Sequence, residues 1–85
     1  MLKERRNILI TGGTGSLGSA LVARWYNMHN LTVLSRDPHK QERMRALYPD
    51  VRFVLADICD YEKVREICKG QDILIHAAAL KSVSS

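Results

Sequence analysis

Apolar residues in this 85-residue chain gather into four short runs. The runs are residues 7–11 (NILIT), 31–34 (LTVL), 51–56 (VRFVLA) and 73–79 (ILIHAAA). Short apolar runs bounded by polar or glycine residues are typical of β-strands. Because the runs are nearly solid rather than alternating, we expect strands that are buried on both faces of a sheet.

Between these runs, apolar residues recur at helical spacing. A first helix is predicted from Ser16, with its apolar stripe at Leu17, Ala20, Leu21, Trp25 and Met28. Asp37 followed by Pro38 predicts the start of a second helix, with Asp37 as its cap. Apolar cover for this helix is expected from Met44, Ala46, Leu47 and Tyr48.

A third helix is predicted between Asp60, as its cap, and Gly70, as its end. Its apolar stripe is Tyr61, Val64, Ile67 and Cys68. Strands that alternate with helices predict right-handed crossovers and a parallel sheet with helices on both faces. The fold class is therefore α/β.

Composition excludes several classes of protein. A hydrophobic content of 46% and a charged content of 26% fit a folded globular chain rather than a disordered one. No window approaches the roughly 18 apolar residues of a membrane span, and MLKERRN lacks the apolar segment of a signal peptide, so a cytoplasmic location is expected. Cys59 and Cys68, nine residues apart, support neither a zinc site nor a disulfide framework.

The net charge of +4 is consistent with a solvated basic surface or with an anionic partner. No nucleic-acid-binding motif and no interleaved aromatic residues accompany the basic residues, so binding to nucleic acid is not expected. His29 and His39 are predicted to lie on the surface, and His76 to be a core or partly buried histidine.

The first turn after residues 7–11 carries Gly12-x-x-Gly15-x-x-Gly18, directly before the predicted helix. Glycines allow the backbone to turn tightly and to approach a pyrophosphate, and the free N–H groups of the helix then face the anion. A tight turn without a ligand is the alternative, but four glycines in seven residues are costly for a turn alone. A P-loop is excluded because no GK[ST] follows.

The end of the second strand bears on the kind of dinucleotide. Ser35 and Arg36 follow this strand, and both can bind a 2′-phosphate, which favours NADP. Asp37 competes as a ribose ligand for NAD, but Pro38 behind it favours the role of helix cap. We therefore expect NADP, with NAD as the alternative.

Four segments resemble the extended short-chain dehydrogenases/reductases that modify nucleotide sugars. TGGTGSLG has the TGxxGxxG form of the superfamily. LSRDPHKQERMR is similar to the LSRDExKQxxMR stretch of UDP-N-acetylglucosamine 4,6-dehydratases and related polysaccharide-biosynthesis enzymes, LADICD to their GDVRD, and HAAALKSV to their HAAALKHVP. The likeness runs from Ile8 to about Val83. It implies a Rossmann-type three-layer fold with four parallel strands in the order 3-2-1-4, truncated after the fourth.

The resemblance also implies site residues. Gly12, Gly15 and Gly18 would line the pyrophosphate, with contacts from Thr14, Ser16 and Leu17. Ser35 and Arg36 would meet the 2′-phosphate, and Asp57 and Ile58 would flank the adenine. Ala77, Ala78 and Ala79 would pass close to the cofactor, with Lys81 near the nicotinamide. Alternatively, Asp57 satisfies a turn, the alanines serve close packing and Lys81 is solvated.

The family's catalytic Tyr-x-x-x-Lys is absent, since Tyr26, Tyr48 and Tyr61 are followed four residues later by Asn30, Arg52 and Arg65. Residues 1–85 are thus interpreted as the NAD(P)-binding half of a nucleotide-sugar dehydratase or epimerase, a fragment or one piece of a split enzyme. The family's reaction oxidises the sugar at C4, eliminates water across C5–C6 and returns hydride at C6, and this chain is not expected to catalyse it alone. The alternative is a non-enzymatic dinucleotide-binding or sensor module.

The predicted fourth strand has a further implication. In the order 3-2-1-4 it is left at an edge of the sheet, long, apolar and unprotected, which invites pairing with another chain. We therefore expect self-association or a complementary chain at this edge.

Overall fold

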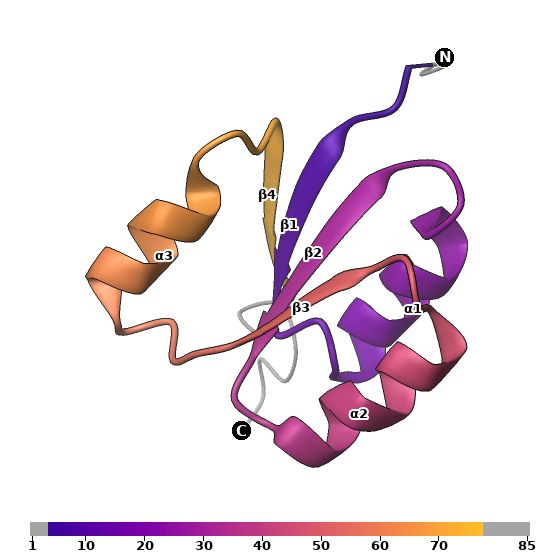
Figure 1. Cartoon of the computed structure of the whole chain (residues 1–85), viewed down its shortest axis with the longest axis horizontal. Helices are drawn as coiled ribbons and strands as arrows, with labels where there is room; N and C mark the ends of the chain where they lie inside the picture. The colour runs from indigo at the N-terminus through magenta and orange to yellow at the C-terminus, as the bar shows by residue number, and fades with distance from the viewer. Residues whose placement is uncertain (1–3, 78–85) are drawn as a thin grey trace.

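The computed structural model describes residues 4–77, and it contains the predicted alternation of strands and helices. In chain order the elements are β1 (Asn7–Thr11), α1 (Ser16–Trp25), β2 (Asn30–Ser35), α2 (Pro38–Leu47), β3 (Arg52–Leu55), α3 (Tyr61–Cys68) and β4 (Ile73–His76). Figure 1 shows α1 and α2 on one side of the sheet and α3 on the other. The three-layer α/β fold is thereby confirmed.

The four strands are parallel and lie in the order β3-β2-β1-β4, as predicted. Ile8 of β1 pairs with Leu31 of β2 on one side and with Ile73 of β4 on the other. All four carboxyl ends therefore point to one edge of the sheet, toward which the loops after the strands converge. Crevices outside this edge are the usual ligand sites of open α/β sheets.

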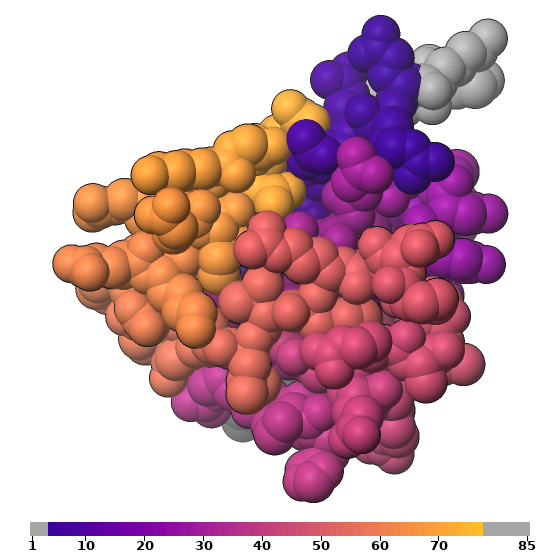
Figure 2. All heavy atoms as spheres, viewed as in Figure 1, coloured from indigo at the N-terminus to yellow at the C-terminus, as the bar shows by residue number. Residues whose placement is uncertain are grey.

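Two apolar clusters fill the spaces between the layers. Ile8, Ile10, Leu31 and Val33 point toward α1 and α2, whereas Leu9 and Leu34 point toward α3. This alternation is the period-2 consequence of a pleated strand. In the space-filling view, α3 and β4 form the left side of the molecule, and β3 and α2 the front and right (Figure 2).

The prediction of solid burial holds for the two inner strands only. β1 and β2 are nearly wholly buried, but Leu55 of β3 and both Ile73 and Leu74 of β4 are exposed. β3 and β4 are the outer strands of the sheet, so each has a neighbour on one side only. The same two strands are shorter than predicted, because β3 ends at Leu55 and β4 at His76.

The predicted apolar stripes of the helices are partly wrong. In α1 the buried residues are Gly18 and Val22, whereas Leu17 and Ala20 are exposed; Met28 lies beyond the end of the helix and is exposed too. In α2 the buried residues are Gln41 and Met44, whereas Ala46 and Leu47 are exposed. In α3 Ile67 is buried as predicted, but Tyr61 is exposed because it is the first residue of the helix.

The predicted helix ends are confirmed. Asp37 caps α2 by accepting hydrogen bonds at Oδ1 from the N–H groups of His39 and Lys40, both at 3.1 Å. Asp60 caps α3 by accepting from the N–H of Lys63. Gly70 has a φ of 81°, a left-handed conformation that favours glycine after a helix.

The predicted placement of the histidines is only partly right. His39 is exposed as predicted, but His29 is buried and its Nδ1 accepts a 3.0 Å hydrogen bond from the N–H of Arg6. His76 is exposed rather than buried, with Nδ1 2.9 Å from Thr11 Oγ1. The two histidines differ in their places in the fold. His29 lies in the turn between α1 and β2, whereas His76 is the last residue of an outer strand.

Candidate functional site

The loop between β1 and α1 forms one wall of the site. Gly12 has a φ of 70°, which a side-chain-bearing residue rarely adopts. Its N–H donates to Leu34 O at 2.8 Å, and its own carbonyl oxygen accepts from the N–H of Gly15 at 3.1 Å. These bonds hold the loop against the carboxyl end of β2.

Packing explains two of the other glycines. A Cβ on Gly18 would lie 2.3 Å from the Cα of Gly13, and a Cβ on Gly13 would lie 2.5 Å from Cγ1 of Val33. Gly18 therefore lets the helix lie against the loop backbone. Gly13, which sequence reasoning left out of the site, lets the loop lie on β2.

Gly15 differs from these two glycines. A Cβ there would meet only Gly12 O, at an ordinary contact distance of 3.5 Å. Packing within the described chain thus does not require glycine at this position, and Gly15 lines the cleft described below. Its missing side chain leaves room for a group that approaches from the cleft.

The first turn of α1 offers unused hydrogen-bond donors. Gly15 is the cap residue but has no side chain to accept from the helix, and the first turn contains no acidic residue. Within residues 4–77, no acceptor takes up the N–H groups of Ser16 and Leu17. Free N–H groups and the positive end of the helix dipole favour an anion here.

A cleft of about 1090 Å³ opens at the carboxyl edge of the sheet. Its lining comes from the last residues of β1, β2 and β4, from the loops after β1, β2 and β3, and from the start of α2: Thr11, Gly12, Thr14, Gly15, Leu34, Ser35, Arg36, Asp37, Pro38, Lys40, Ala56, Asp57, Ile58, Cys59 and His76. Seven of the predicted site residues thus come together in one cleft: Gly12, Thr14, Gly15, Ser35, Arg36, Asp57 and Ile58.

Other predicted residues lie elsewhere. Ser16, Leu17 and Gly18 belong to α1 and do not line the cleft. Ala77 is buried in the α1–α2 cluster, which agrees with the packing alternative. Ala78, Ala79 and Lys81 lie outside the described residues.

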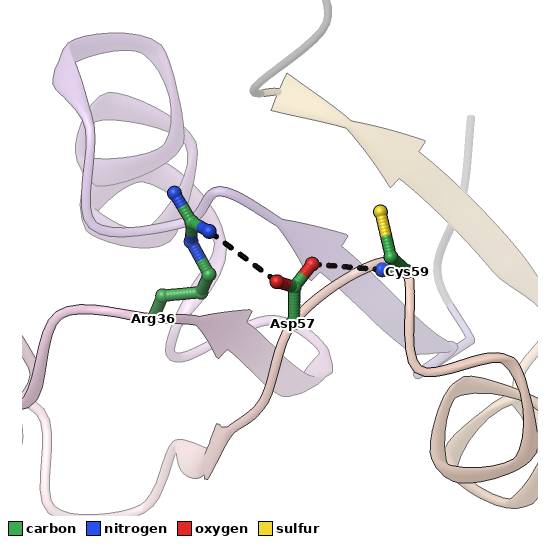
Figure 3. A network of polar contacts seen from close by, with 3 residues as sticks. All are labelled: Arg36, Asp57 and Cys59. Atoms are coloured by element: carbon green, nitrogen blue, oxygen red, sulfur yellow. Dashed lines mark hydrogen bonds and ion pairs between the residues drawn. The ribbon is translucent and has the colours of Figure 1, made fainter.

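Arg36 and Asp57 face each other across the cleft mouth (Figure 3). Arg36 Nη1 lies 3.3 Å from Asp57 Oδ2, and Asp57 Oδ1 accepts a 2.9 Å hydrogen bond from the N–H of Cys59. The Cys59 N–H and, to a lesser degree, the Arg36 guanidinium lower the pKa of Asp57 below its ordinary value. The pair joins the segments after β2 and β3, which agrees with the prediction that Asp57 satisfies a turn.

The start of α2 contributes two polar residues that sequence reasoning missed. Lys40 lines the cleft as a second cation beside Arg36. Gln41 is buried, and its Nε2 donates to Ser35 Oγ at 2.9 Å. The sequence could have pointed to both residues, because the Asp37 cap places them in the first turn of α2, next to the end of β2. The cap hydrogen bonds also lower the pKa of Asp37.

Thr11 and His76 are also additions to the site. Both are the last residues of their strands, β1 and β4, where ligand-facing residues of parallel sheets collect. That rule would have found Thr11, but not His76, because the fourth strand was predicted to run to residue 79. Within residues 4–77, no group of three or more His, Cys, Asp or Glu side chains gathers as a metal site, and no helix there is long and apolar enough to cross a membrane.

Residues 8–85 match the family described as "Polysaccharide biosynthesis protein", which is nearly the whole chain. The chain belongs to this family. The resemblance to nucleotide-sugar epimerases and dehydratases found in the sequence is thus confirmed.

Curated relatives of this polysaccharide biosynthesis family chain include proteins named UDP-glucose 4-epimerase. The one from Rickettsia bellii (strain RML369-C) is 38% identical over 86 residues, which covers 92% of this chain and 25% of the relative. The one from Rickettsia akari (strain Hartford) is 37% identical with the same coverage. The chain thus spans about a quarter of the length of these relatives.

Solved structures show the same fold. The X-ray structure of Pen from Bacillus thuringiensis has a TM-score of 0.85 and 28% identity, covering 99% of this chain and 28% of that protein. The UDP-N-acetylglucosamine 4-epimerase from Methanobrevibacter ruminantium M1, in complex with UDP-N-acetylmuramic acid, has a TM-score of 0.76 and 27% identity, covering 94% and 26%. Both align to this chain over about a quarter of their own length.

Proposed function

We propose that this chain is the NADP-binding portion of a nucleotide-sugar epimerase or dehydratase. The observation that carries the proposal is that Gly15, which lines the cleft at the carboxyl edge of the sheet and leaves room for a ligand there, is also the cap residue of α1, whose first N–H groups have no acceptor within residues 4–77. Membership of the family and the similarity to proteins named as sugar-nucleotide epimerases support it.

The pyrophosphate fits at this turn for electrostatic reasons. The N–H groups of Ser16 and Leu17 lack acceptors within the described chain, and the helix dipole adds partial positive charge. Thr14 lines the cleft from the same loop. In this proposal the loop residues bind and orient the dinucleotide by its phosphates.

The preference for NADP rests on the end of β2. Arg36 and Lys40 are cations at the cleft, and Ser35, which also lines it, directly precedes Arg36 in the chain. Asp57 competes for Arg36, but the pair is largely exposed, so it costs little to exchange one anion for another there. Guanidinium and hydroxyl donors together suit a phosphate better than a ribose hydroxyl.

When bound, the nicotinamide would supply hydride transfer to and from the sugar. The residues of this chain would bind and orient the cofactor, and its sequence holds no Tyr-x-x-x-Lys to act as acid or base on the substrate. We therefore assign to residues 1–85 the role of the cofactor-binding domain, with the sugar nucleotide held by further protein.

The test is binding of NADP⁺ and NAD⁺ to the purified chain, by calorimetry and by thermal unfolding, since a ligand of the folded form raises its stability. We expect the chain to bind NADP⁺ more tightly than NAD⁺. In Arg36→Met the affinity for NADP⁺ should fall about tenfold, because a charge-assisted hydrogen bond is lost. Arg43→Met, which removes an arginine of α2 that does not line the cleft, is the matched control. Failure of the wild-type chain to bind either dinucleotide would overturn the proposal.

The edge of β4 supports a second, separate proposal. Within the described residues β4 pairs with β1 only, and Ile73 and Leu74 are exposed. β4 is shorter than predicted, with four residues, but its free edge can still pair with another strand. We propose self-association or pairing with a complementary chain there. Sedimentation velocity should detect a concentration-dependent dimer that Leu74→Lys weakens, and a monomer at all concentrations would contradict self-association.

A further inference from the structure

Gln41 is a polar residue in a position that packing alone does not explain. It lies in the first turns of α2 and is only 2% exposed. Its Nε2 lies 2.9 Å from Ser35 Oγ and 2.8 Å from Val54 O, so the amide joins β2 to β3 beneath the cleft. Burying an amide is costly unless its hydrogen bonds are made.

These two contacts fix the direction of the hydrogen bonds. A backbone carbonyl oxygen can only accept, so the Gln41 atom beside Val54 O must be the nitrogen. The same nitrogen then donates to Ser35 Oγ, which accepts. A hydroxyl that accepts from one side must direct its own proton elsewhere.

Ser35 has one direction open to it. Ser35 lines the cleft, and its hydroxyl donates no hydrogen bond to another group among residues 4–77. The proton is therefore free to be donated into the cleft. Arg36 and Lys40 attract any anion, whereas a directed hydroxyl donor at 7% exposure adds a preference for an acceptor at one place.

We propose that Gln41 is a positioning residue for cofactor choice. It turns the Ser35 hydroxyl into a donor toward the 2′-phosphate of the adenosine, and it touches no ligand itself. This inference rests on the proposed function, since it assumes that the cleft binds the adenosine part of a dinucleotide.

The test uses two small probes, 2′,5′-ADP and ADP, which differ by the 2′-phosphate and need only this cleft. Their dissociation constants are measured by calorimetry for the full chain and for Gln41→Met, Ser35→Ala and the double variant. We expect Gln41→Met to raise the dissociation constant of 2′,5′-ADP about tenfold and that of ADP less than about twofold, as for the loss of one hydrogen bond to a charged group. Ser35→Ala should lose the same preference for 2′,5′-ADP over ADP. The double variant should lose no more of this preference than either single variant.

The chain supplies a matched control in Gln71. Its Nε2 donates to Thr32 Oγ1 at 3.4 Å, so it is also a glutamine amide bound to a hydroxyl of β2, but it lies at the opposite end of the strand. Gln71→Met should leave the affinities for both probes unchanged.

A structural role for Gln41 would give a different result. If Gln41→Met weakens both probes equally, or if its effect adds fully to that of Ser35→Ala, the proposal is overturned while the proposed function stands. If Gln41→Met does not fold, Ser35→Ala decides, because an unchanged preference for 2′,5′-ADP would overturn the inference. Failure of the wild-type chain to bind either probe would overturn both the inference and the proposed function.

Discussion

The two ends of the sheet differ in what becomes of their polar groups. At the amino end, the N–H of Asn7 donates to Asp72 Oδ2 at 2.9 Å, its Nδ2 donates to Gly70 O at 3.1 Å, and its Oδ1 accepts from Asn30 Nδ2 at 2.9 Å. The protein thus satisfies these groups itself. The one buried side-chain polar atom without a partner within residues 4–77, Gln71 Oε1, is an acceptor, so it offers no donor to an anion.

At the carboxyl end, hydrogen-bonding capacity remains. Within residues 4–77 the N–H groups of Ser16 and Leu17 have no acceptor, the Ser35 hydroxyl donates no hydrogen bond, and Lys40 lines the cleft. Both ends are built from the same strands, so the fold alone does not distinguish them. Hydrogen-bond donors without a partner in the described chain, rather than topology, distinguish the end of the sheet that can bind an anion.

The largest effect is expected where the carboxyl end depends on backbone contact. Gly18→Val would place a Cβ 2.3 Å from the Cα of Gly13 and 2.5 Å from Gly12 O, and backbone cannot yield as a side chain does. We expect a loss of more than about 4 kcal/mol in the free energy of unfolding, enough to unfold a small domain. Urea unfolding followed by circular dichroism measures this, and an unchanged midpoint would contradict the described packing.

A smaller effect, confined to binding, is expected at Gly15. Gly15→Ala adds a methyl that the protein accommodates, but it enters the cleft beside the free donors of α1. We expect the dissociation constant for NADP⁺ to rise about tenfold, or about 1.4 kcal/mol, with a melting temperature close to that of the wild type. Equal binding by the variant would show that no ligand passes this position.

The opposite pattern is expected at the amino end. Asn7→Ala removes the amide that bonds to Gly70 and Asn30, which should cost about 1 kcal/mol in the free energy of unfolding. The affinity of the folded chain for NADP⁺ should not change, because Asn7 lies at the far end of the sheet. A fall in affinity comparable to that in Gly15→Ala would break the distinction between the two ends.

The smallest effect concerns pH and Asp57. Its pKa in the folded chain is lowered by the Cys59 N–H and by Arg36, so the stabilising contribution is complete above the ordinary value of 3.8 and is lost as pH falls through the lower folded value. Asp57→Asn should therefore be less stable than the wild type at neutral pH, with the two urea midpoints converging below pH 3.8. A constant difference down to the lowest pH would contradict the pairing.

Local signals in the sequence were sufficient for the two inner strands and the helix caps, whereas the sheet order was predicted from the family resemblance. Apolar runs identified β1 and β2 to within a residue at each end, and Asp37-Pro38 identified the start of α2. The glycine spacing and the residues after the second apolar run likewise predicted Gly12, Gly15, Ser35 and Arg36 at the cleft, whereas Thr14, Asp57 and Ile58 were predicted only through the family resemblance.

The buried faces of the helices could not be predicted, because small or polar residues take part in them. In α1 the inward face is Gly18, Leu21, Val22 and Trp25, and glycine carries no hydrophobic signal. In α2 the buried Gln41 is recognised only through its partners on β2 and β3. Both residues are defined by contacts with the loop or with neighbouring strands, which no local pattern encodes.

The register of the sheet has a consequence for synthesis. β1 lies between β2 and β4 in the sheet. Along the chain, Asn30 comes 23 residues after Asn7, whereas Asp72 comes 65 residues after Asn7. On a ribosome, β1 can pair with β2 early, whereas its other edge waits until β4 has been made. Distant pairings of this kind are slow to form, and a waiting apolar edge is prone to aggregation. β1, an inner strand of the finished sheet, is thus the strand most exposed to aggregation while the chain is being synthesised.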